Sequence, residues 1–174
     1  MSSHTSASSS EHKKHACDVN NISIAVVTVS DTRTTDTDIN GQYLKEQITT
    51  AGHTVADYFI IADECDLVDE VIERLANDKV NVIVLNGGTG ISKRDRTFDV
   101  VSKKLNKVLS GFGEIFRYLS YKEIGSSAIL SRATAGIYKD TLIFSVPGSP
   151  NAVKLAWEKL IQPEIKHLVW EMNK

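Results

Sequence analysis

Apolar residues run almost without interruption through several short segments of the chain, which are separated by polar stretches. The most continuous of these runs are residues 22–29, residues 80–85 and Thr141–Val146, which are rich in β-branched side chains. Such runs are typical of strands inside a sheet that is covered on both faces. We therefore predict a buried strand in each run, and a further strand over residues 55–61.

Between the strands, apolar residues recur at spacings of three and four, as they do on one face of an amphipathic helix. The pattern is clearest over residues 67–76. An earlier helix, which Asp38 or Asn40 could cap, is predicted to end at Gly52, because glycine commonly follows the last turn of a helix. This alternation predicts an α/β fold with a parallel sheet covered on both faces. Further helical segments are predicted over residues 98–109 and from Pro150 onward.

Residues 1–20 differ from the rest of the chain in being polar and low in complexity. Such a segment buries too little apolar surface to offset its ordering entropy, so we predict a disordered tail followed by one domain over residues 21–174. His12, His15 and Cys17 could also form a metal cluster, but the tail offers no framework to fix ligand geometry. A solvated tail is the favoured interpretation.

Charge and composition exclude several classes of protein. A formal net charge of -2 gives no basic field to attract nucleic acid or an anionic membrane, so any phosphate must be held locally. No apolar run approaches the ~20 residues that span a bilayer, and the start of the chain lacks the apolar centre of a signal peptide. Cys17 and Cys65 are too few for a disulfide framework and suit a reducing compartment. We predict a cytoplasmic protein that binds neither nucleic acid nor membrane.

Glycines crowd the loop that directly follows the predicted strand over residues 80–85. Gly87, Gly88, Thr89 and Gly90 lie there, at a strand end where open α/β sheets bind ligands. Glycine lets the backbone approach a ligand closely and exposes successive amide donors to anionic oxygens. The spacing matches neither the P-loop nor the Rossmann fingerprint, which disfavours a P-loop ATPase and a dehydrogenase. The sequence predicts a phosphate-binding loop, with a solvated turn as the alternative.

One carboxylate stands among the cations that follow these glycines. Asp95 is surrounded by Lys93, Arg94 and Arg96. A carboxylate in a phosphate-binding loop suits coordination of Mg²⁺ or orientation of a hydroxyl. Asp95 is therefore a candidate functional residue, although it could instead simply pair with its neighbours.

Polar residues also follow the other predicted strands and should reach the same edge of the sheet. Three of these residues have a structural alternative: Asp31 could be a turn residue, Asp63 the cap of the next helix, and Ser149 an N-cap. The residues concerned are Ser30, Asp31, Asp63, Pro147, Gly148 and Ser149.

Seven short motifs follow one another between about residue 22 and residue 174. They are Thr28-Val29-Ser30-Asp31, Asp38-Ile39-Asn40-Gly41, Ala51-Gly52-His53, Gly87-Gly88-Thr89-Gly90 with Asp95, Gly111-Phe112-Gly113-Glu114, Ser131-Arg132-Ala133 and Pro147-Gly148-Ser149. In these residues the chain resembles the MoaB/MogA molybdopterin-binding family, which shares its domain with the G domain of gephyrin. Residues 112–117 and 120–125 resemble the MoaB branch more than the MogA branch.

The resemblance implies a three-layer α/β/α fold with a mostly parallel sheet, and self-association as a trimer or hexamer. It also implies a reaction in which the terminal phosphate of molybdopterin attacks the α-phosphorus of ATP and releases pyrophosphate, with Mg²⁺ on the polyphosphate. Asp63 and Asp95 match the family's two functional aspartates and would also hold Mg²⁺. By the same resemblance, nucleotide phosphates would bind Gly87, Gly88, Thr89 and Gly90, and molybdopterin would contact Ser30, Asp31, Pro147, Gly148 and Ser149.

The leading hypothesis is therefore an MgATP-dependent molybdopterin adenylyltransferase. Its rival is a non-catalytic protein of the same pathway that binds molybdopterin and passes it on. The presence of both Asp63 and Asp95 favours catalysis over binding alone, and a purely structural trimeric scaffold would need neither aspartate beside a glycine-rich loop.

Overall fold

The structure of the chain, a computed structural model, describes residues 19–174. The predicted tail over residues 1–20 lies outside this range except for Val19 and Asn20. The alternative metal cluster of His12, His15 and Cys17 also lies outside the described residues.

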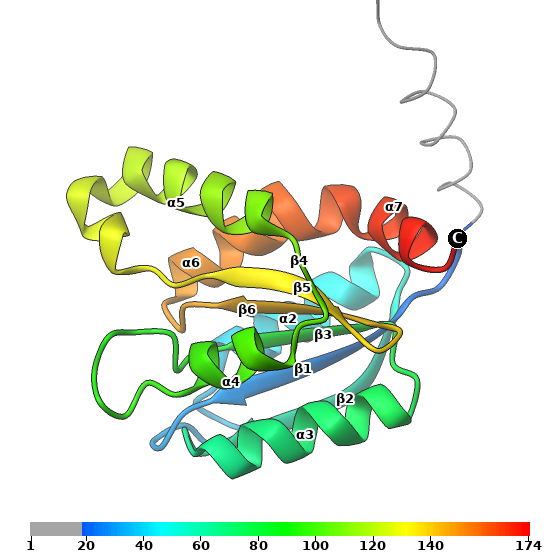
Figure 1. The fold of residues 1–174 in the computed structure, drawn as a ribbon, viewed down its shortest axis with the longest axis horizontal. Helices are drawn as coiled ribbons and strands as arrows, with labels where there is room; N and C mark the ends of the chain where they lie inside the picture. Colours follow the sequence, from blue (N-terminus) through cyan, green and yellow to red (C-terminus); the bar gives the residue numbers. More distant parts are fainter. Residues whose placement is uncertain (1–18) are drawn as a thin grey trace, which may run out of the picture.

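A six-stranded sheet in the order β2-β1-β3-β6-β5-β4 forms the centre of the molecule (Figure 1). The four strands β2, β1, β3 and β6 are parallel, whereas β5 and β4 pair antiparallel at one side. The mostly parallel sheet is thus confirmed, with an antiparallel extension. The strands are β1 (Ser23–Val29), β2 (Thr54–Ile61), β3 (Val82–Asn86), β4 (Lys107–Val108), β5 (Thr134–Tyr138) and β6 (Thr141–Val146).

Helices cover both faces of the sheet, so the predicted three-layer α/β/α fold is confirmed. Alternate residues of β1 enter opposite cores: Ile24 and Val26 pack with α2, α5, α6 and α7, whereas Ala25 and Val27 pack with α3 and α4. The full-length apolar run of β1 follows from this double burial. The helices are α2 (Ile39–Thr50), α3 (Cys65–Asn77), α4 (Thr97–Lys104), α5 (Ser110–Ile124), α6 (Pro150–Ala156) and α7 (Gln162–Met172).

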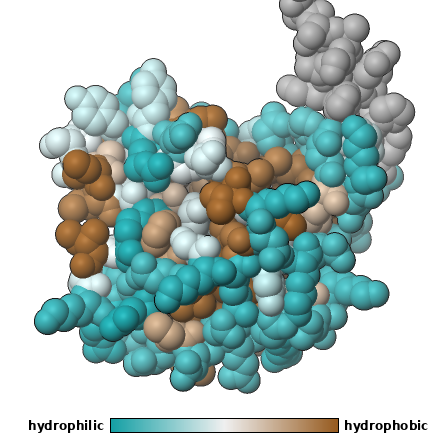
Figure 2. Space-filling view, in the orientation of Figure 1, coloured by the Kyte–Doolittle hydropathy of each residue, from teal (hydrophilic) through white to brown (hydrophobic). Residues whose placement is uncertain are grey.

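Two short irregular helices complete the chain path. A π-helical turn, η2 (Trp157–Ile161), joins α6 to α7 just before Pro163, whose missing N–H cannot continue a regular helical ladder. A 3-10 segment, η1 (Gly125–Leu130), follows α5. Exposed apolar side chains gather over the end of α5 and over η1, at the left of Figure 2. None of the helices within residues 19–174 is long and apolar enough to cross a membrane.

The prediction of a helix over residues 98–109 is wrong in its second half. The helix ends at Lys104, and Lys107–Val108 instead forms the edge strand β4 against β5. Backbone pairing outweighs the helical pattern here, because the amides of Asn106 and Leu109 donate to β5 carbonyls at 2.8 Å. Gly136 permits this approach, since a Cβ there would lie 2.3 Å from the Lys107 carbonyl oxygen. Helix α5 and strand β5 were not predicted.

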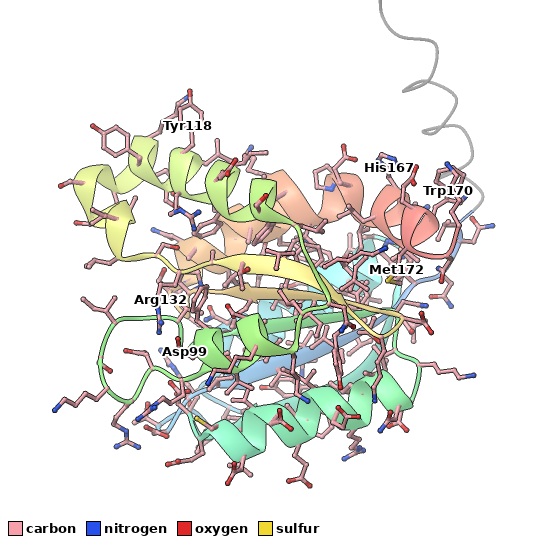
Figure 3. All side chains as sticks on the ribbon, viewed as in Figure 1. Asp99, Tyr118, Arg132, His167, Trp170 and Met172 are labelled. Carbon is pink, nitrogen blue, oxygen red and sulfur yellow. The ribbon has the colours of Figure 1, made fainter. Side chains whose placement is uncertain are left out.

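The parallel strands point their carboxyl ends to the left in Figure 1. The side chains of Asp99 and Arg132 lie at this end of the molecule, opposite Trp170 and Met172 of α7 (Figure 3). The loops that leave β1, β2, β3 and β6 therefore meet at one edge of the sheet, as their shared direction requires.

Strand β6 offers a test of how buried hydroxyls contribute to stability. Among residues 19–174, the Ser145 Oγ is the buried side-chain atom without a hydrogen-bond partner, whereas the Thr141 Oγ1 donates to the Val80 carbonyl at 2.8 Å. We expect Ser145→Ala to raise the free energy of unfolding by about 1 kcal/mol, because it removes an unpaired buried polar group. Thr141→Val should lower it by about 1–2 kcal/mol by leaving the Val80 carbonyl unpaired. Urea unfolding of both variants measures these effects, and a loss of stability in Ser145→Ala would show that its hydroxyl has a partner.

Candidate functional site

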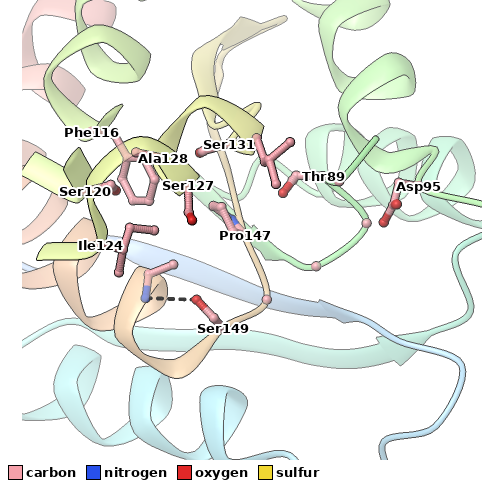
Figure 4. A pocket seen from close by; sticks show the side chains of 16 residues that line it. Thr89, Asp95, Phe116, Ser120, Ile124, Ser127, Ala128, Ser131, Pro147 and Ser149 are labelled. Carbon is pink, nitrogen blue, oxygen red and sulfur yellow. Dashed lines mark hydrogen bonds between the residues drawn. The ribbon is translucent and has the colours of Figure 1, made fainter. Parts of the chain in front are cut away.

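A cavity of about 320 Å³ lies where β3 and β6 end (Figure 4). It brings together two predicted loops, Gly87 to Gly90 and Pro147 to Ser149, which are far apart in the sequence. Its opposite wall comes from α5 and η1, which sequence analysis did not assign to the site. That wall combines apolar side chains with hydroxyl groups and comprises Phe116, Ser120, Ile124, Ser127, Ala128, Leu130 and Ser131.

Steric limits on the backbone explain the glycines of the first loop. Gly87 has φ +108°, and a Cβ there would lie 2.1 Å from the Val29 carbonyl oxygen. Gly88 has φ +60°, and its Cβ would lie 2.1 Å from the Thr97 Oγ1. Any side chain at either position would therefore push apart the ends of β1 and β3 or displace the start of α4.

The second loop packs directly on the first through Gly148. A Cβ on Gly148 would lie 3.1 Å from the Gly87 Cα. The Asn40 amide links the two loops, because its Nδ2 donates to the Gly148 carbonyl at 2.8 Å and to the Asn86 Oδ1 at 3.1 Å. Asn40 therefore bridges loops, and Asp38 is the residue that caps α2, through a hydrogen bond from the Gly41 amide at 3.0 Å.

A network of hydrogen bonds around Asp38 supports the Asn40 bridge. The Asp38 Oδ2 accepts hydrogen bonds from the Thr28 Oγ1 at 2.6 Å and from the Tyr58 hydroxyl at 2.7 Å. The Asn86 amide donates in turn to the Thr28 Oγ1 at 2.9 Å. Burial, together with the hydrogen bond to Asp38, raises the pKa of Tyr58 above its ordinary value, so Tyr58 remains a proton donor. The hydrogen bonds of Asn86 and the bridging role of Asn40 were not predicted from the sequence, although both residues lie in or beside the motifs described above.

Asp63 does not cap the helix that follows it. Helix α3 begins after Glu64 without a side-chain cap, and Asp63 reaches across to the start of α4 instead. Its Oδ1 accepts from the Arg96 amide and from the Thr97 Oγ1, both at 3.2 Å. It also borders the glycine loop, since a Cβ on Gly88 would lie 2.7 Å from its Oδ2.

Asp95 borders the same loop at Gly90, where a Cβ would lie 2.7 Å from its Oδ2, and it lines the cavity. Its Oδ2 accepts a hydrogen bond from the Ser92 amide at 2.9 Å. Hydrogen bonding to Ser92 lowers the pKa of the Asp95 carboxyl, although burial acts against this shift. Burial raises the pKa of the Asp63 carboxyl, hydrogen bonds from Arg96 and Thr97 oppose the rise, and the charge of Asp95 adds to it. The site thus contains two neighbouring carboxyls whose pKa values are shifted in opposite directions.

Ser30 and Asp31, which follow β1 and were predicted to contact a ligand, make hydrogen bonds and an ion pair within the protein. The Ser30 Oγ accepts from the Thr32 and Arg33 amides at 3.3 Å, as in a turn. Asp31 pairs with Arg94 at 2.8 Å and accepts from the Asp63 amide at 3.3 Å, so it ties the ends of β1 and β2 to the loop after the glycines. Asp31 lines neither the cavity at the ends of β3 and β6 nor the neighbouring cavity that Ser30 lines.

Ser30 lines a second cavity of about 270 Å³, together with Asn40 and Asn86. Gly148 borders both cavities, and Pro147 and Ser149 border the first. The Ser149 Oγ accepts from the Ala152 amide at 3.3 Å, so its predicted role as an N-cap is present (Figure 4). Apart from Asp31 and Asp63, which line neither cavity, the predicted site residues are therefore divided between two adjacent cavities that meet at Gly148.

The acidic pair suits a metal ion that arrives with its ligand. Within residues 19–174 there is no cluster of three or more His, Cys, Asp or Glu side chains that could hold an ion by itself. Mg²⁺ is commonly bound by one or two carboxylates together with substrate phosphates. Asp63, beside Gly88, and Asp95, beside Gly90, suit an ion that is held by two carboxylates and by the phosphates of a ligand.

Comparison with known proteins places this geometry in a family. The family model described as "Probable molybdopterin binding domain" matches residues 25–167. The chain is 48% identical over 166 residues to Molybdenum cofactor biosynthesis protein B of Bacillus subtilis, covering 94% of this chain and 96% of the relative. The chain belongs to the MoaB/MogA molybdopterin-binding family. The resemblance inferred from the sequence motifs is thereby confirmed.

Other members of the MoaB/MogA family agree in sequence and fold. Molybdenum cofactor biosynthesis protein B of Staphylococcus aureus (strain MRSA252) is 48% identical, with 88% of this chain and 93% of the relative covered. A crystal structure of Molybdenum cofactor biosynthesis protein B has a TM-score of 0.86 at 46% identity, over 88% of this chain and 97% of that one. The tungsten cofactor synthesizing protein MoaB from Pyrococcus furiosus has a TM-score of 0.80 at 34% identity, over 88% and 98%. The region matched by the family model contains both cavities.

The opposite pKa shifts of the acidic pair predict opposite effects on stability. Ionised Asp63 is disfavoured in the folded state, so Asp63→Asn, which keeps an acceptor for Arg96 and Thr97, should raise the melting temperature at pH 7. Ionised Asp95 is favoured in the folded state, so Asp95→Asn should lower it. The difference for Asp63→Asn should shrink as pH falls towards about 4, where this carboxyl becomes protonated, whereas the difference for Asp95→Asn should largely persist at pH 4, because its lowered pKa keeps the folded-state carboxyl ionised there.

Thermal melts of the two variants and the wild type at pH 7 and pH 4 provide the measurement. A loss of stability at pH 7 that is equal in both variants would contradict the assignment of opposite environments.

Proposed function

We propose that the chain binds molybdopterin and adenylylates it with MgATP, as a step in molybdenum cofactor biosynthesis. A terminal phosphate oxygen of molybdopterin forms a bond to the α-phosphorus of ATP. The bond from that phosphorus to the bridging oxygen of the β-phosphate breaks, and pyrophosphate leaves. The observation that carries the proposal is the pair Asp63 and Asp95, which flanks a glycine loop packed against the loop of Gly148.

Two adjacent cavities suit a reaction between two ligands. Nucleotide phosphates would lie over the loop of Gly87, Gly88, Thr89 and Gly90, whose three glycines lack side chains that could block approach. Molybdopterin would contact Pro147, Gly148 and Ser149, and the cavity beside Ser30. Because Gly148 borders both cavities and packs on Gly87, ligands held by the two loops would be brought together at this junction.

Asp63 and Asp95 would have different roles, because their environments differ. Asp95, whose pKa is lowered, stays ionised and would hold Mg²⁺ with the nucleotide phosphates. Asp63, whose pKa is raised, would share the ion and fix the start of α4 through Arg96 and Thr97. Mg²⁺, when bound, neutralises charge on the polyphosphate.

One observation favours the rival function of a non-catalytic molybdopterin carrier. The Asp63 Oδ1 is already occupied by hydrogen bonds from Arg96 and Thr97, which would be equally useful in a protein that only binds. A carrier would bind molybdopterin without consuming ATP, so measurement of the product separates the two functions.

Asp95→Asn should reduce formation of adenylylated molybdopterin by roughly 100- to 1,000-fold, because an electrostatic contact to the transition state is lost. The assay incubates the full chain with molybdopterin, Mg²⁺ and ATP labelled at the α-phosphate, and measures labelled molybdopterin. Asp66→Asn, an exposed carboxylate in the first turn of α3, is the matched control and should leave turnover unchanged.

Omission of Mg²⁺ should abolish turnover in all three proteins. Binding of molybdopterin by the wild type without any labelled product would favour the carrier, and full turnover in Asp95→Asn would remove this residue from the mechanism.

We also propose that the chain assembles as a trimer or as a pair of trimers. The apolar patch over the end of α5 and over η1 supports self-association, because large exposed apolar surfaces mark interaction sites (Figure 2). Ile129 is 84% exposed, Tyr121 61% and Tyr118 59%, and Arg117 lies among them. Both the trimer and the hexamer follow from the family resemblance.

Ile129→Glu should shift the mass measured by light scattering towards the monomer, because it places a charge in the proposed interface. Leu67→Glu, on the exposed side of α3 and away from the patch, is the matched control and should keep the mass of the wild type. A wild-type mass equal to the monomer would contradict the proposed assembly.

A further inference from the structure

Arg132, in the stretch between η1 and β5, is joined to both ends of the loop that carries Asp95. Its Nε donates to the Thr89 carbonyl at 3.1 Å, and its Nη2 donates to the carbonyls of Gly90 and Asp95, the latter at 3.0 Å. Its Nη1 donates to the Asp99 carboxylate at 3.1 Å (Figure 3). All three guanidinium nitrogens are therefore used within the protein.

The surroundings of this guanidinium fix its position. It lies 4.7 Å from the centre of the Phe98 ring, and Asp99 balances its charge. A planar guanidinium offers five N–H donors in fixed directions, so it can hold several carbonyls at once, whereas a lysine ammonium is a compact charge on a flexible stem. Arg132 thus acts as a rigid cross-link rather than as a free cation for a ligand.

This cross-link sets the direction of backbone groups on the ligand side of the loop. In a trans peptide the C=O and the following N–H point in opposite directions. Because the Thr89 carbonyl points to Arg132, the Gly90 N–H points away from it, and this amide interacts with the Asp95 carboxylate. Arg132 also holds the Asp95 carbonyl. The Gly90 amide and the Asp95 carboxylate, which interact with each other, therefore both belong to residues that the Arg132 side chain holds.

We infer that Arg132 is a positioning residue for the proposed adenylyl transfer, acting by holding residues 89–95 so that the Asp95 carboxylate and the Gly90 amide face the cavity. The expected effect of Arg132 on turnover rests on the proposed function. Arg132 is assigned no contact with either ligand, because all three of its guanidinium nitrogens are hydrogen-bonded within the protein. A purely structural role would lower stability and leave the turnover of the folded protein unchanged.

The test compares Arg132→Lys with Arg74→Lys in the full chain. Arg74 is a matched control, because it lies 5.1 Å from the Phe59 ring and pairs with Asp57 at 3.4 Å, on α3 and away from the cavity. Arg132→Lys should lower kcat by roughly 100-fold at saturating molybdopterin and MgATP, with little change in KM, since small misplacement of a reacting group has effects of this size. Arg74→Lys should keep the kcat of the wild type.

Two further readouts separate positioning from stability. Hydrogen exchange measured by mass spectrometry should become faster in residues 89–95 of Arg132→Lys at a temperature well below its melting point, and remain unchanged in β1 and β3. The double variant Arg132→Lys with Asp95→Asn should lose little more activity than Asp95→Asn alone, because both changes act on the same carboxylate.

The outcomes are distinct for the inference and for the proposed function. Unchanged exchange in residues 89–95 of Arg132→Lys, or an unchanged kcat, would overturn the inference. A wild-type chain that forms no adenylylated molybdopterin would overturn the proposed function. In that case faster exchange of residues 89–95 in Arg132→Lys, with weaker binding of MgATP in calorimetry, would still support the positioning role, and unchanged values of both would overturn it.

Discussion

The close packing of backbone where β1, β3 and β6 end is the constraint on which the rest of the site depends. At Gly87 the chain passes so near the Val29 carbonyl that no side chain fits, and Gly148 packs on the same glycine from the other side. Three strand ends are thereby brought within backbone contact. The contact leaves amides without overlying side chains, and it creates two cavities that share one wall. The backbone geometry of the candidate site is consequently set by steric exclusion at its glycines.

Charge is then added at positions that the backbone has already fixed. Asp63 and Asp95 border one loop at Gly88 and Gly90, and their opposite pKa shifts arise from different surroundings: partial burial for Asp63, and hydrogen bonding to Ser92 for Asp95. The fold therefore disfavours the ionised form of Asp63 and favours the ionised form of Asp95. Such opposed environments are typical of sites that bind or transform ligands, where local stability is sacrificed for function.

The sequence predicted the parts of the fold that depend on local pattern. The doubly buried strands, α2 and α3 were confirmed, and Asp38, one of the two predicted caps of α2, is the cap, because apolar spacing and capping chemistry are local properties. Strand β5 and edge strand β4 were missed, since their pairing depends on a contact between Gly136 and Lys107 that no local pattern records. Both functional candidates Asp63 and Asp95 reached the same loop, yet the partners of Asp63 on α4 could not be read from spacing. The wall from α5 and η1 was missed for the same reason.

The two loops of the site are supported from different layers of the fold. On the α2 side, Asp38 and Asn40 hold Gly148 against the end of β3 through buried hydrogen bonds. On the α4 side, Asp63 holds the start of α4 while Arg132 holds the loop of Asp95. These two sets of contacts share no side chain, because the sheet lies between them. The two halves are joined where the loops meet, through the contact of Gly87 with Gly148, the Asn40 bridge and the hydrogen bond from the Gly87 amide to the Val146 carbonyl. The relative position of two bound ligands would then depend most directly on these contacts between the loops.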